Sequence, residues 1–226
     1  MIELRNVTKY YPPNTYALKN VTLFIKPKEF VSVVGRSGTG KTTLAKLLIA
    51  QEKPNEGRMM IGGWDITDIH PYEIPMLRRQ IGVVFQDFNL LPQKTVFENV
   101  AFALEVLGFS YFKIVKVVPE ILEIVGLKDK MNRYPTQMSG GEQQRVVIAR
   151  ALVHHPKILI ADEPTGNLDI YNTQQVLDLL LKINELGTTV LLISHDKNVV
   201  DFVNRRVIKL ENGEVVSDEE KGKFNL

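Results

Sequence analysis

One segment of the chain has the residue types and the spacing of a loop that binds phosphate groups. Its sequence, GRSGTGKT from Gly35 to Thr42, fits the pattern G-x-x-x-x-G-K-[ST] and lies between a predicted strand and a predicted helix. The glycines allow the backbone to wrap an anion with its N–H groups pointing inward. Lys41 would add a positive charge for the β- and γ-phosphates, and the Thr42 hydroxyl can ligate Mg²⁺. The segment therefore predicts nucleotide binding, and a glycine-rich turn with a solvated lysine is the competing interpretation.

Two adjacent carboxylates, Asp162 and Glu163, end the apolar run ILIA. Because neighbouring side chains on a strand point to opposite faces, we expect them to have different roles. Asp162 suits a position that orients Mg²⁺ or its water. Glu163, just beyond the strand, is a candidate general base that polarises the attacking water. The alternative, a pair of solvated acids at a strand end, is weakened by the phosphate loop in the same chain.

A third segment, MSGGEQQR from Met138 to Arg145, precedes a helical stretch that reaches Leu152. Ser139 and Glu142 have the spacing of a capping box, which is a purely structural interpretation. Two glycines at the start of a helix nevertheless cost entropy unless another group approaches the backbone closely. An exposed helix N-terminus with a serine is also an anion site. The segment is therefore a second candidate for contact with phosphate.

The elements that must position these groups alternate between strands and helices. Apolar and alternating runs predict strands at 2–7, 21–25, 30–34, 58–61, 81–85, 157–161, 189–193 and 207–210, and near 215. Helical spacing predicts helices at 42–49, 96–107, 117–125 and 176–186. Asn212-Gly213 indicates a hairpin turn, and we expect a loose, charged tail after Ser217. The pattern predicts an α/β sheet domain with a helical insertion.

Composition narrows the function classes. The chain has 226 residues and a net charge of +2, which argues against a broad nucleic-acid-binding surface. It has no cysteine, so disulfides, iron–sulfur clusters and cysteine zinc sites are excluded. The sequence contains no apolar run of the roughly 20 residues that cross a bilayer, and its start has no apolar signal segment. We therefore expect a cytoplasmic protein that does not itself span a membrane.

The phosphate loop, the segment SGGEQQR and the strand ILIADEP, in this order, resemble the ATP-binding cassette (ABC) ATPases over essentially the whole chain. The resemblance implies a P-loop NTPase fold with a mixed sheet core, an antiparallel β subdomain and an inserted helical subdomain. It implies one ATP-binding domain over residues 1–226, with a core at 1–87 and 155–226 and a helical signature subdomain at 88–154. Met138 departs from the usual leucine, but the two side chains have similar volumes.

Roles carried over from the family mark further residues. Gln86 matches a glutamine that touches Mg²⁺, and His195 matches a histidine that contacts the γ-phosphate. Tyr11 matches an aromatic that stacks on adenine, although Tyr10 and Tyr16 lie nearby, and stacking does not require ATP rather than GTP. The implied catalytic residues are Lys41, Glu163 and His195, and the implied Mg²⁺ contacts are Thr42, Gln86 and Asp162. The implied nucleotide contacts are Tyr11, Gly35, Arg36, Ser37, Gly38, Thr39, Gly40, Lys41, Thr42, Thr43, Gln86, Ser139, Gly140, Gly141, Glu142 and Asp169.

The resemblance also implies partners. Two copies would place ATP and Mg²⁺ between the phosphate loop of one copy and Ser139–Gly141 of the other, with Gly166–Asp169 at the interface. Since the cassette fills the chain, an integral membrane subunit must carry out the work that ATP hydrolysis drives. That subunit would also hold the protein at the inner face of the membrane. Gln86-Asp87 and Thr95-Val96 favour the cell-division cassettes, whose partner activates peptidoglycan hydrolases. The alternative is the ATPase of a lipoprotein-releasing or macrolide-type exporter. Cassettes of DNA repair or of ribosomes are disfavoured, because they carry coiled-coil insertions, zinc modules or two cassettes.

Overall fold

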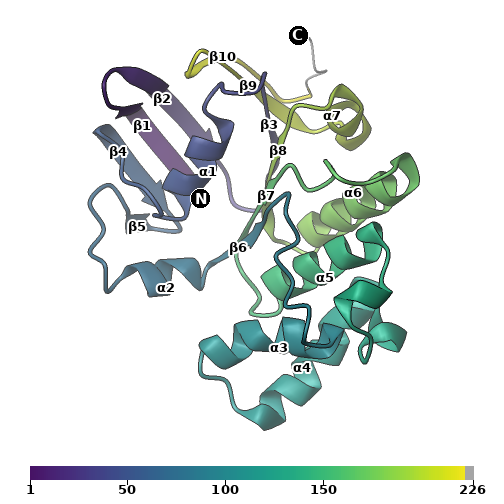
Figure 1. Ribbon diagram of the computed structural model, residues 1–226. Helices are drawn as coiled ribbons and strands as arrows, with labels where there is room; N and C mark the ends of the chain where they lie inside the picture. Colours follow the sequence, from purple (N-terminus) through teal and green to yellow (C-terminus); the bar gives the residue numbers. More distant parts are fainter. Residues whose placement is uncertain (222–226) are drawn as a thin grey trace.

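The computed structural model describes residues 1–221 and contains two β-sheets (Figure 1). The six-stranded sheet has the order β10-β9-β3-β8-β7-β6, in which β10 is antiparallel to β9 and the other neighbours are parallel. Its strands are β3 (Phe30–Val34), β6 (Ile81–Val84), β7 (Ile158–Asp162), β8 (Thr189–Ser194), β9 (Arg206–Glu211) and β10 (Glu214–Glu219). The antiparallel sheet has the order β2-β1-β4-β5. Its strands are β1 (Ile2–Tyr11), β2 (Thr15–Ile25), β4 (Glu56–Ile61) and β5 (Trp64–Asp65). The predicted mixed core and antiparallel subdomain are confirmed.

Helix α1 (Lys41–Leu48) follows the phosphate loop and is packed in the core between the two sheets. The alternation of side chains along β7 explains the two covered faces. Ile158 and Ile160 point into the same core as α1 and the antiparallel sheet, whereas Leu159 and Ala161 point to the helices on the other face. Buried on both faces, the parallel strands consist of continuous apolar runs.

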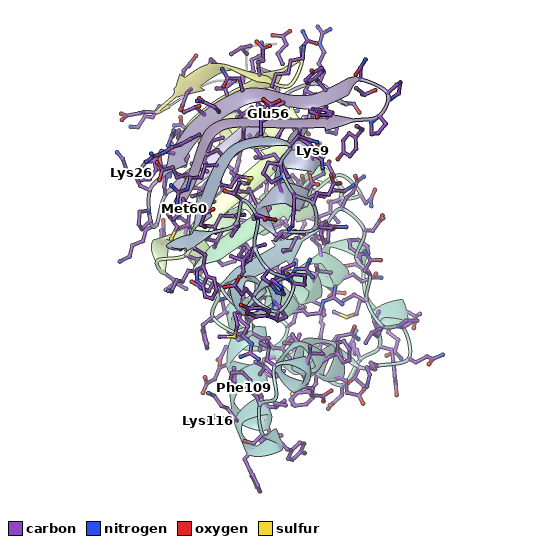
Figure 2. All side chains as sticks on the ribbon, turned by 90° about the vertical axis from the view of Figure 1, so that its left-hand side faces the viewer. Lys9, Lys26, Glu56, Met60, Phe109 and Lys116 are labelled. Carbon is purple, nitrogen blue, oxygen red and sulfur yellow. The ribbon has the colours of Figure 1, made fainter. Side chains whose placement is uncertain are left out.

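The other face carries the helical insertion. It contains α3 (Val96–Val106), α4 (Tyr111–Ile124), two short 3₁₀ turns at Lys128–Lys130 and Pro135–Gln137, and α5 (Gly140–Leu152). Figure 1 shows α3 and α4 at the end of the molecule away from the antiparallel sheet. In Figure 2, likewise, Glu56 and Met60 lie on the antiparallel sheet, with Lys26 at the end of β2, whereas Phe109, between α3 and α4, and Lys116 of α4 lie at the opposite end. Helices α6 (Ile170–Glu185) and α7 (Lys197–Val203) complete the layer, and α2 (Ile74–Arg78) precedes β6. None of the helices in residues 1–221 is long and apolar enough to span a membrane.

Four of the α-helices in residues 1–221 begin with a side-chain cap. Thr95 and Glu98 at α3, and Ser139 and Glu142 at α5, form complete capping boxes. Asp169 caps α6 by accepting a hydrogen bond from the Asn172 N–H, and Asp196 caps α7 in the same way. These bonds satisfy backbone donors that a helix start otherwise leaves unpaired. The capping interpretation of Ser139 and Glu142 is therefore confirmed.

The structure differs from the predicted elements in several places. Helix α4 begins at Tyr111, not near Val117, because its first turn exposes Tyr111 and Phe112 and so hides the helical pattern. The short elements β5, α2 and α7 were not predicted, since they are too short to show a period. Strand β10 continues past Ser217 to Glu219, where a loose tail was expected, because Arg206 forms a two-pronged ion pair with Asp218. Residues 222–226, part of that expected tail, lie outside the described residues.

The two sheets meet at the backbone of Ala17 in β2. The Lys19 N–H donates a hydrogen bond of 2.7 Å to the Gly213 oxygen in the turn between β9 and β10. A Cβ atom on Gly213 would lie 2.9 Å from the Ala17 oxygen, and one on Gly40 would lie 2.1 Å from the same oxygen. The Ala17 carbonyl is therefore packed between the end of the phosphate loop and the hairpin turn. This contact fixes the antiparallel sheet against the loop that precedes α1.

Candidate functional site

The phosphate loop is a compact turn whose backbone is packed against the end of β9. A Cβ atom on Gly35 would lie 2.3 Å from the Leu210 oxygen, so no side chain fits there. Gly38 and Gly40 have φ angles of 80° and 99°, which other residues rarely adopt. Within the described residues, α1 has no side-chain cap and no acidic residue in its first turn, unlike α3 and α5. Its free N–H groups and the positive end of its dipole suit an external anion.

Lys41, the first residue of α1, is buried and bonded to its own loop. Its Nζ atom donates hydrogen bonds to the Gly35 oxygen at 2.7 Å and to the Arg36 oxygen at 2.8 Å. Burial lowers the pKa of Lys41, and the nearby carboxylates of Glu163 and Asp162 oppose that shift. The lysine therefore lies beside two acids at the position where a phosphate group would enter.

Asp162 and Thr42 form the part of the site that fits a divalent cation. Asp162 is buried at the end of β7, and the Thr42 side chain lies within hydrogen-bond reach of it. Burial raises the pKa of Asp162, and the bond from Thr42 partly offsets that effect. Its Oδ1 atom is buried and has no hydrogen-bond partner among the described residues. An orphaned carboxylate oxygen next to a hydroxyl matches the hard oxygen donors that Mg²⁺ prefers.

The described residues contain no group of three or more His, Asp or Glu side chains that could hold a metal ion by themselves. The two oxygen donors that are present, the Asp162 carboxylate and the Thr42 hydroxyl, fit a Mg²⁺ ion that keeps water ligands and binds substrate phosphates.

Glu163 and His195 are directly paired. The His195 Nδ1 atom lies 2.6 Å from Glu163 Oε1, and His195 follows β8, the strand next to β7. Glu163 has a left-handed backbone with φ of 50°, so the alternation of the strand stops at Asp162. The alternation of a strand therefore does not extend to Glu163, and the different roles expected of the two acids stay a prediction. A strained backbone of this kind is often found at functional positions.

Gln86 follows β6 and lies against the loop that precedes α6. The Asn167 side chain donates a hydrogen bond of 3.4 Å to the Gln86 oxygen, and a Cβ atom on Gly166 would lie 3.1 Å from Gln86 Nε2. A cavity of about 440 Å³ brings nine of the nineteen predicted site residues together. It is lined by Ala17, Ser37, Gly38, Gly40, Lys41, Thr42, Thr43, Gln86, Glu163 and His195. Arg36 and Thr39 line a neighbouring hollow with residues 209–212.

Tyr11 lies at the end of β1 beside α1. Its hydroxyl donates a hydrogen bond of 2.6 Å to Glu52, and Thr43 lies within hydrogen-bond reach of it. Burial, followed by the bond to Glu52, raises the pKa of Tyr11. Lys9 Nζ lies 5.2 Å from the centre of its ring. Tyr16, half exposed, packs against Tyr10 with ring centres 5.6 Å apart. The choice of the stacking residue stays a prediction.

The segment at the start of α5 is not part of this cavity. Ser139 is exposed, and Glu142 is bonded to Ser139 and to Lys130, which holds the pKa of Glu142 below its usual range. None of the described residues that line the cavity comes from 138–145. Asp169, at the start of α6, is exposed as well. A single chain therefore presents two separate surfaces, one with the phosphate loop and one with the serine–glycine segment.

Two residues near these surfaces were missed by sequence reasoning. Arg150 in α5 donates hydrogen bonds to the Asn89 oxygen at 2.8 Å and to the Phe88 oxygen at 3.1 Å, which holds the segment after Gln86. A lone arginine in a helix gives no signal for such a role. Asn172 contacts both Asp169 and Gly141. Its position three residues after a capping aspartate was the available signal.

The fold and the site are those of an ATP-binding cassette. They combine a phosphate loop between β3 and α1, two acids at the end of β7 and an inserted helical block. Residues 18–166 match the family model "ABC transporter". The chain belongs to this family. Among its relatives it is similar to the cell division ATP-binding protein FtsE, with 50% identity in Bacillus subtilis and 48% in Mycobacterium tuberculosis. These alignments cover 99% and 100% of this chain and 98% and 99% of those proteins. The chain is therefore an FtsE-like ABC ATPase.

A solved structure shows the same fold. It is the dimeric, post-hydrolysis state of the ATP-binding cassette MJ0796 bound to ADP and Pi, with a TM-score of 0.86 and 41% identity. The match covers 99% of this chain and 100% of that one. The expected resemblance to the ABC ATPases is thus confirmed, whereas the role of each single residue stays a prediction.

Proposed function

We propose that this chain hydrolyses Mg²⁺-ATP at a site completed by a second copy, and that the cycle drives an FtsX-like integral membrane subunit in cell division. The observation that carries the proposal is the convergence of Lys41, Thr42, Gln86, Glu163 and His195 on one cavity. Four different strand or helix ends deliver these groups, and each offers a function that phosphoryl transfer needs.

Binding would begin at the phosphate loop. The N–H groups of the loop and of the first turn of α1 would donate to phosphate oxygens, while Lys41 would exchange its two carbonyl partners for the phosphates. Thr42, Gln86 and Asp162 would hold Mg²⁺, which supplies positive charge to the phosphate oxygens when bound. Tyr11 or Tyr16 would stack its ring on the base of the nucleotide. Stacking would add affinity for the nucleotide but would not distinguish ATP from GTP.

Hydrolysis would then depend on the pair Glu163 and His195. The Glu163 carboxylate would orient the attacking water and accept a proton as the new oxygen–phosphorus bond forms and the bond between the γ-phosphorus and the bridging oxygen breaks, releasing ADP. His195, whose Nδ1 atom is 2.6 Å from Glu163 Oε1, would fix the rotamer of that carboxylate. Its other ring nitrogen, Nε2, would contact the γ-phosphate. The exposed side of the cavity leaves this reaction open to water until another surface covers it.

A second copy is the surface that fits. Ser139 and Asp169 are exposed and lie outside the cavity of their own chain, so they are available to the cavity of another. An arrangement in which each chain offers both surfaces closes with two-fold symmetry and two identical sites. The dimeric MJ0796 structure with ADP and Pi supports this arrangement. Attachment to the inner face of the membrane would come from the membrane subunit.

Replacement of Glu163 by glutamine tests the proposal. Because the amide cannot accept the proton, we expect the release of phosphate from ATP to fall by about 10²–10⁴-fold, while ATP binding persists. The variant should accumulate as an ATP-bound dimer, measured by light scattering with saturating ATP and Mg²⁺. Glu185→Gln, at the exposed end of α6, is the matched control and should hydrolyse ATP normally. A monomeric Glu163→Gln protein under these conditions would refute the two-copy site.

The membrane partner needs a separate test. We expect the chain, affinity-purified from detergent-solubilised membranes, to retain an FtsX-like subunit in a ratio that rises when the Glu163→Gln variant is loaded with ATP. Recovery of a permease from a lipoprotein-releasing or macrolide-type exporter would instead favour that alternative.

A further inference from the structure

A contact between α5 and α6 joins the two surfaces that the proposed function assigns to the second copy. The Asn172 backbone N–H donates a hydrogen bond of 2.8 Å to Asp169 Oδ1, and its side-chain Nδ2 donates one of 2.6 Å to Asp169 Oδ2. Both carboxylate oxygens of Asp169 are thus held by one residue. These bonds keep the pKa of Asp169 below its usual range.

The other end of the same amide lies against the start of α5. A Cβ atom on Gly141 would lie 1.9 Å from Asn172 Oδ1, 2.4 Å from its Cγ and 2.8 Å from its Cβ. Gly141 therefore has an intramolecular reason to be a glycine, apart from any approach of a nucleotide. One turn further along both helices, Arg145 Nη1 donates a hydrogen bond of 2.6 Å to Gln175 Oε1. The two helix starts are joined side by side at two successive turns.

We propose that Asn172 is a positioning residue that fixes the loop at Asp169 relative to the segment Ser139–Gly141. This inference rests on the proposed two-copy site, since both segments would approach the nucleotide of the other copy. Because Asn172 contacts one by hydrogen bonds and the other by direct packing, the two move as one rigid unit. Asn172 itself need not touch the nucleotide.

The kinetic test compares Asn172→Ala with Asn184→Ala. Asn184 lies in the last turn of the same helix and also donates two hydrogen bonds to backbone oxygens, of Lys28 and Thr188, so it controls for lost side-chain bonds. A misplacement of about 1 Å costs about 10²-fold in rate, so we expect Asn172→Ala to lower kcat at least about tenfold. The binding of a fluorescent ATP analogue to the isolated chain should change by less than about twofold, as should the kcat of Asn184→Ala. Equal kcat values for the two variants would overturn the inference.

A second test examines the contact without any nucleotide. We expect Gly141→Ala to lower the Tm of the nucleotide-free chain by roughly 3–10 °C, because the added methyl group overlaps the Asn172 amide. The double variant Gly141→Ala, Asn172→Ala removes that amide and should regain more than half of the loss. Losses that simply add in the double variant would overturn the contact on which the inference rests.

These readouts separate the inference from the proposed function. If the unchanged chain does not hydrolyse ATP and its Glu163→Gln variant does not form a dimer, the proposed function fails and the positioning role fails with it. If the unchanged chain hydrolyses ATP, the Glu163→Gln variant forms the dimer, and Asn172→Ala has the same kcat as Asn184→Ala, only the positioning role fails.

Discussion

At the scale of single residues, Lys41 has an environment that is unusual for a lysine. It is 6% exposed, its partners are carbonyl oxygens of its own loop, and two carboxylates lie close to it. A buried ammonium with neutral hydrogen-bond partners costs free energy that a phosphate would return. The loop is therefore prepared for an anion at the expense of the stability of the empty chain.

We expect Lys41→Ala to weaken ATP binding at least about tenfold, since a hydrogen bond to a charged group contributes about 1.5–3 kcal/mol. Isothermal titration with ATP and Mg²⁺ measures the change. Lys46→Ala is the matched control, because Lys46 is on the same helix and its half-exposed side chain pairs with Glu52. Affinity that stays unchanged in Lys41→Ala would contradict the assignment of this loop.

At the scale of elements, one buried side chain holds the second half of the segment between Gln86 and α3, whose first half is bonded to Arg150. Asn99, fully buried in α3, accepts a hydrogen bond from the Leu91 N–H and donates to the oxygens of Leu91, Lys94 and Thr95. The segment has no strand or helix of its own between 86 and 95. Its shape therefore depends on an amide from the helix that follows it.

We expect Asn99→Leu to destabilise the chain by about 2–4 kcal/mol, because the four hydrogen bonds between the buried Asn99 amide and the backbone of Leu91, Lys94 and Thr95 are lost. Urea unfolding measures the difference, and hydrogen exchange should rise first at Leu91. Asn132→Leu, at an exposed position before α5, should change stability by less than about 0.5 kcal/mol. Similar losses in the two variants would show that the buried network is not the cause.

The start of α5 makes a pH-dependent contribution. Lys130 lowers the pKa of Glu142, so the pair stabilises the folded chain above the unfolded pKa of about 4.5 and loses this effect as the pH falls through the lower folded value. We expect Lys130→Met to be less stable by about 1 kcal/mol, equally at pH 7.5, 6.5 and 5.5. The difference should shrink only below about pH 4.5. A difference that already shrinks between pH 7.5 and 5.5 would assign it to another group.

Elements were predictable where the sequence carries a period. The apolar runs at Phe30–Val34 and Ile158–Asp162 lie in the sheet as expected, and the helix after the phosphate loop begins at Lys41. The start of α4 was missed because Tyr111 and Phe112 are exposed. The left-handed backbone at Glu163 was also not predictable, since a strand pattern does not show it. Arg150 bonds to a distant segment, and Asn172 packs on the distant Gly141; spacing along the chain does not encode such contacts.

At the scale of the whole molecule, the two candidate phosphate-contacting surfaces lie apart on one chain. The cavity contains the phosphate loop, whereas the start of α5 belongs to the helical block. The start of α5 does not reach the cavity of its own chain, so it can contact a bound nucleotide only in the cavity of a second copy. Activity should therefore depend on the encounter of two chains.

We expect the rate of ATP hydrolysis to rise with nearly the square of the protein concentration where monomers dominate, and linearly where dimers dominate. Phosphate release measured over a hundredfold dilution series tests this. The Asn184→Ala chain, whose altered position lies at the far end of α6, should follow the same curve. A rate that stays strictly linear down to the lowest concentration, with a monomer seen by light scattering, would show that one chain suffices.

The packing of Ala17 between Gly40 and Gly213 has a practical consequence. The hairpin turn at Asn212-Gly213 is the kind of surface loop into which a reporter sequence is commonly inserted. Here its backbone rests on the residue that also supports the phosphate loop, so an insertion would disturb nucleotide binding from the outside. The turn at Gly108, where a Cβ atom would meet no atom of residues 1–221 within 4 Å, is the better place for a fluorophore that follows the ATP cycle.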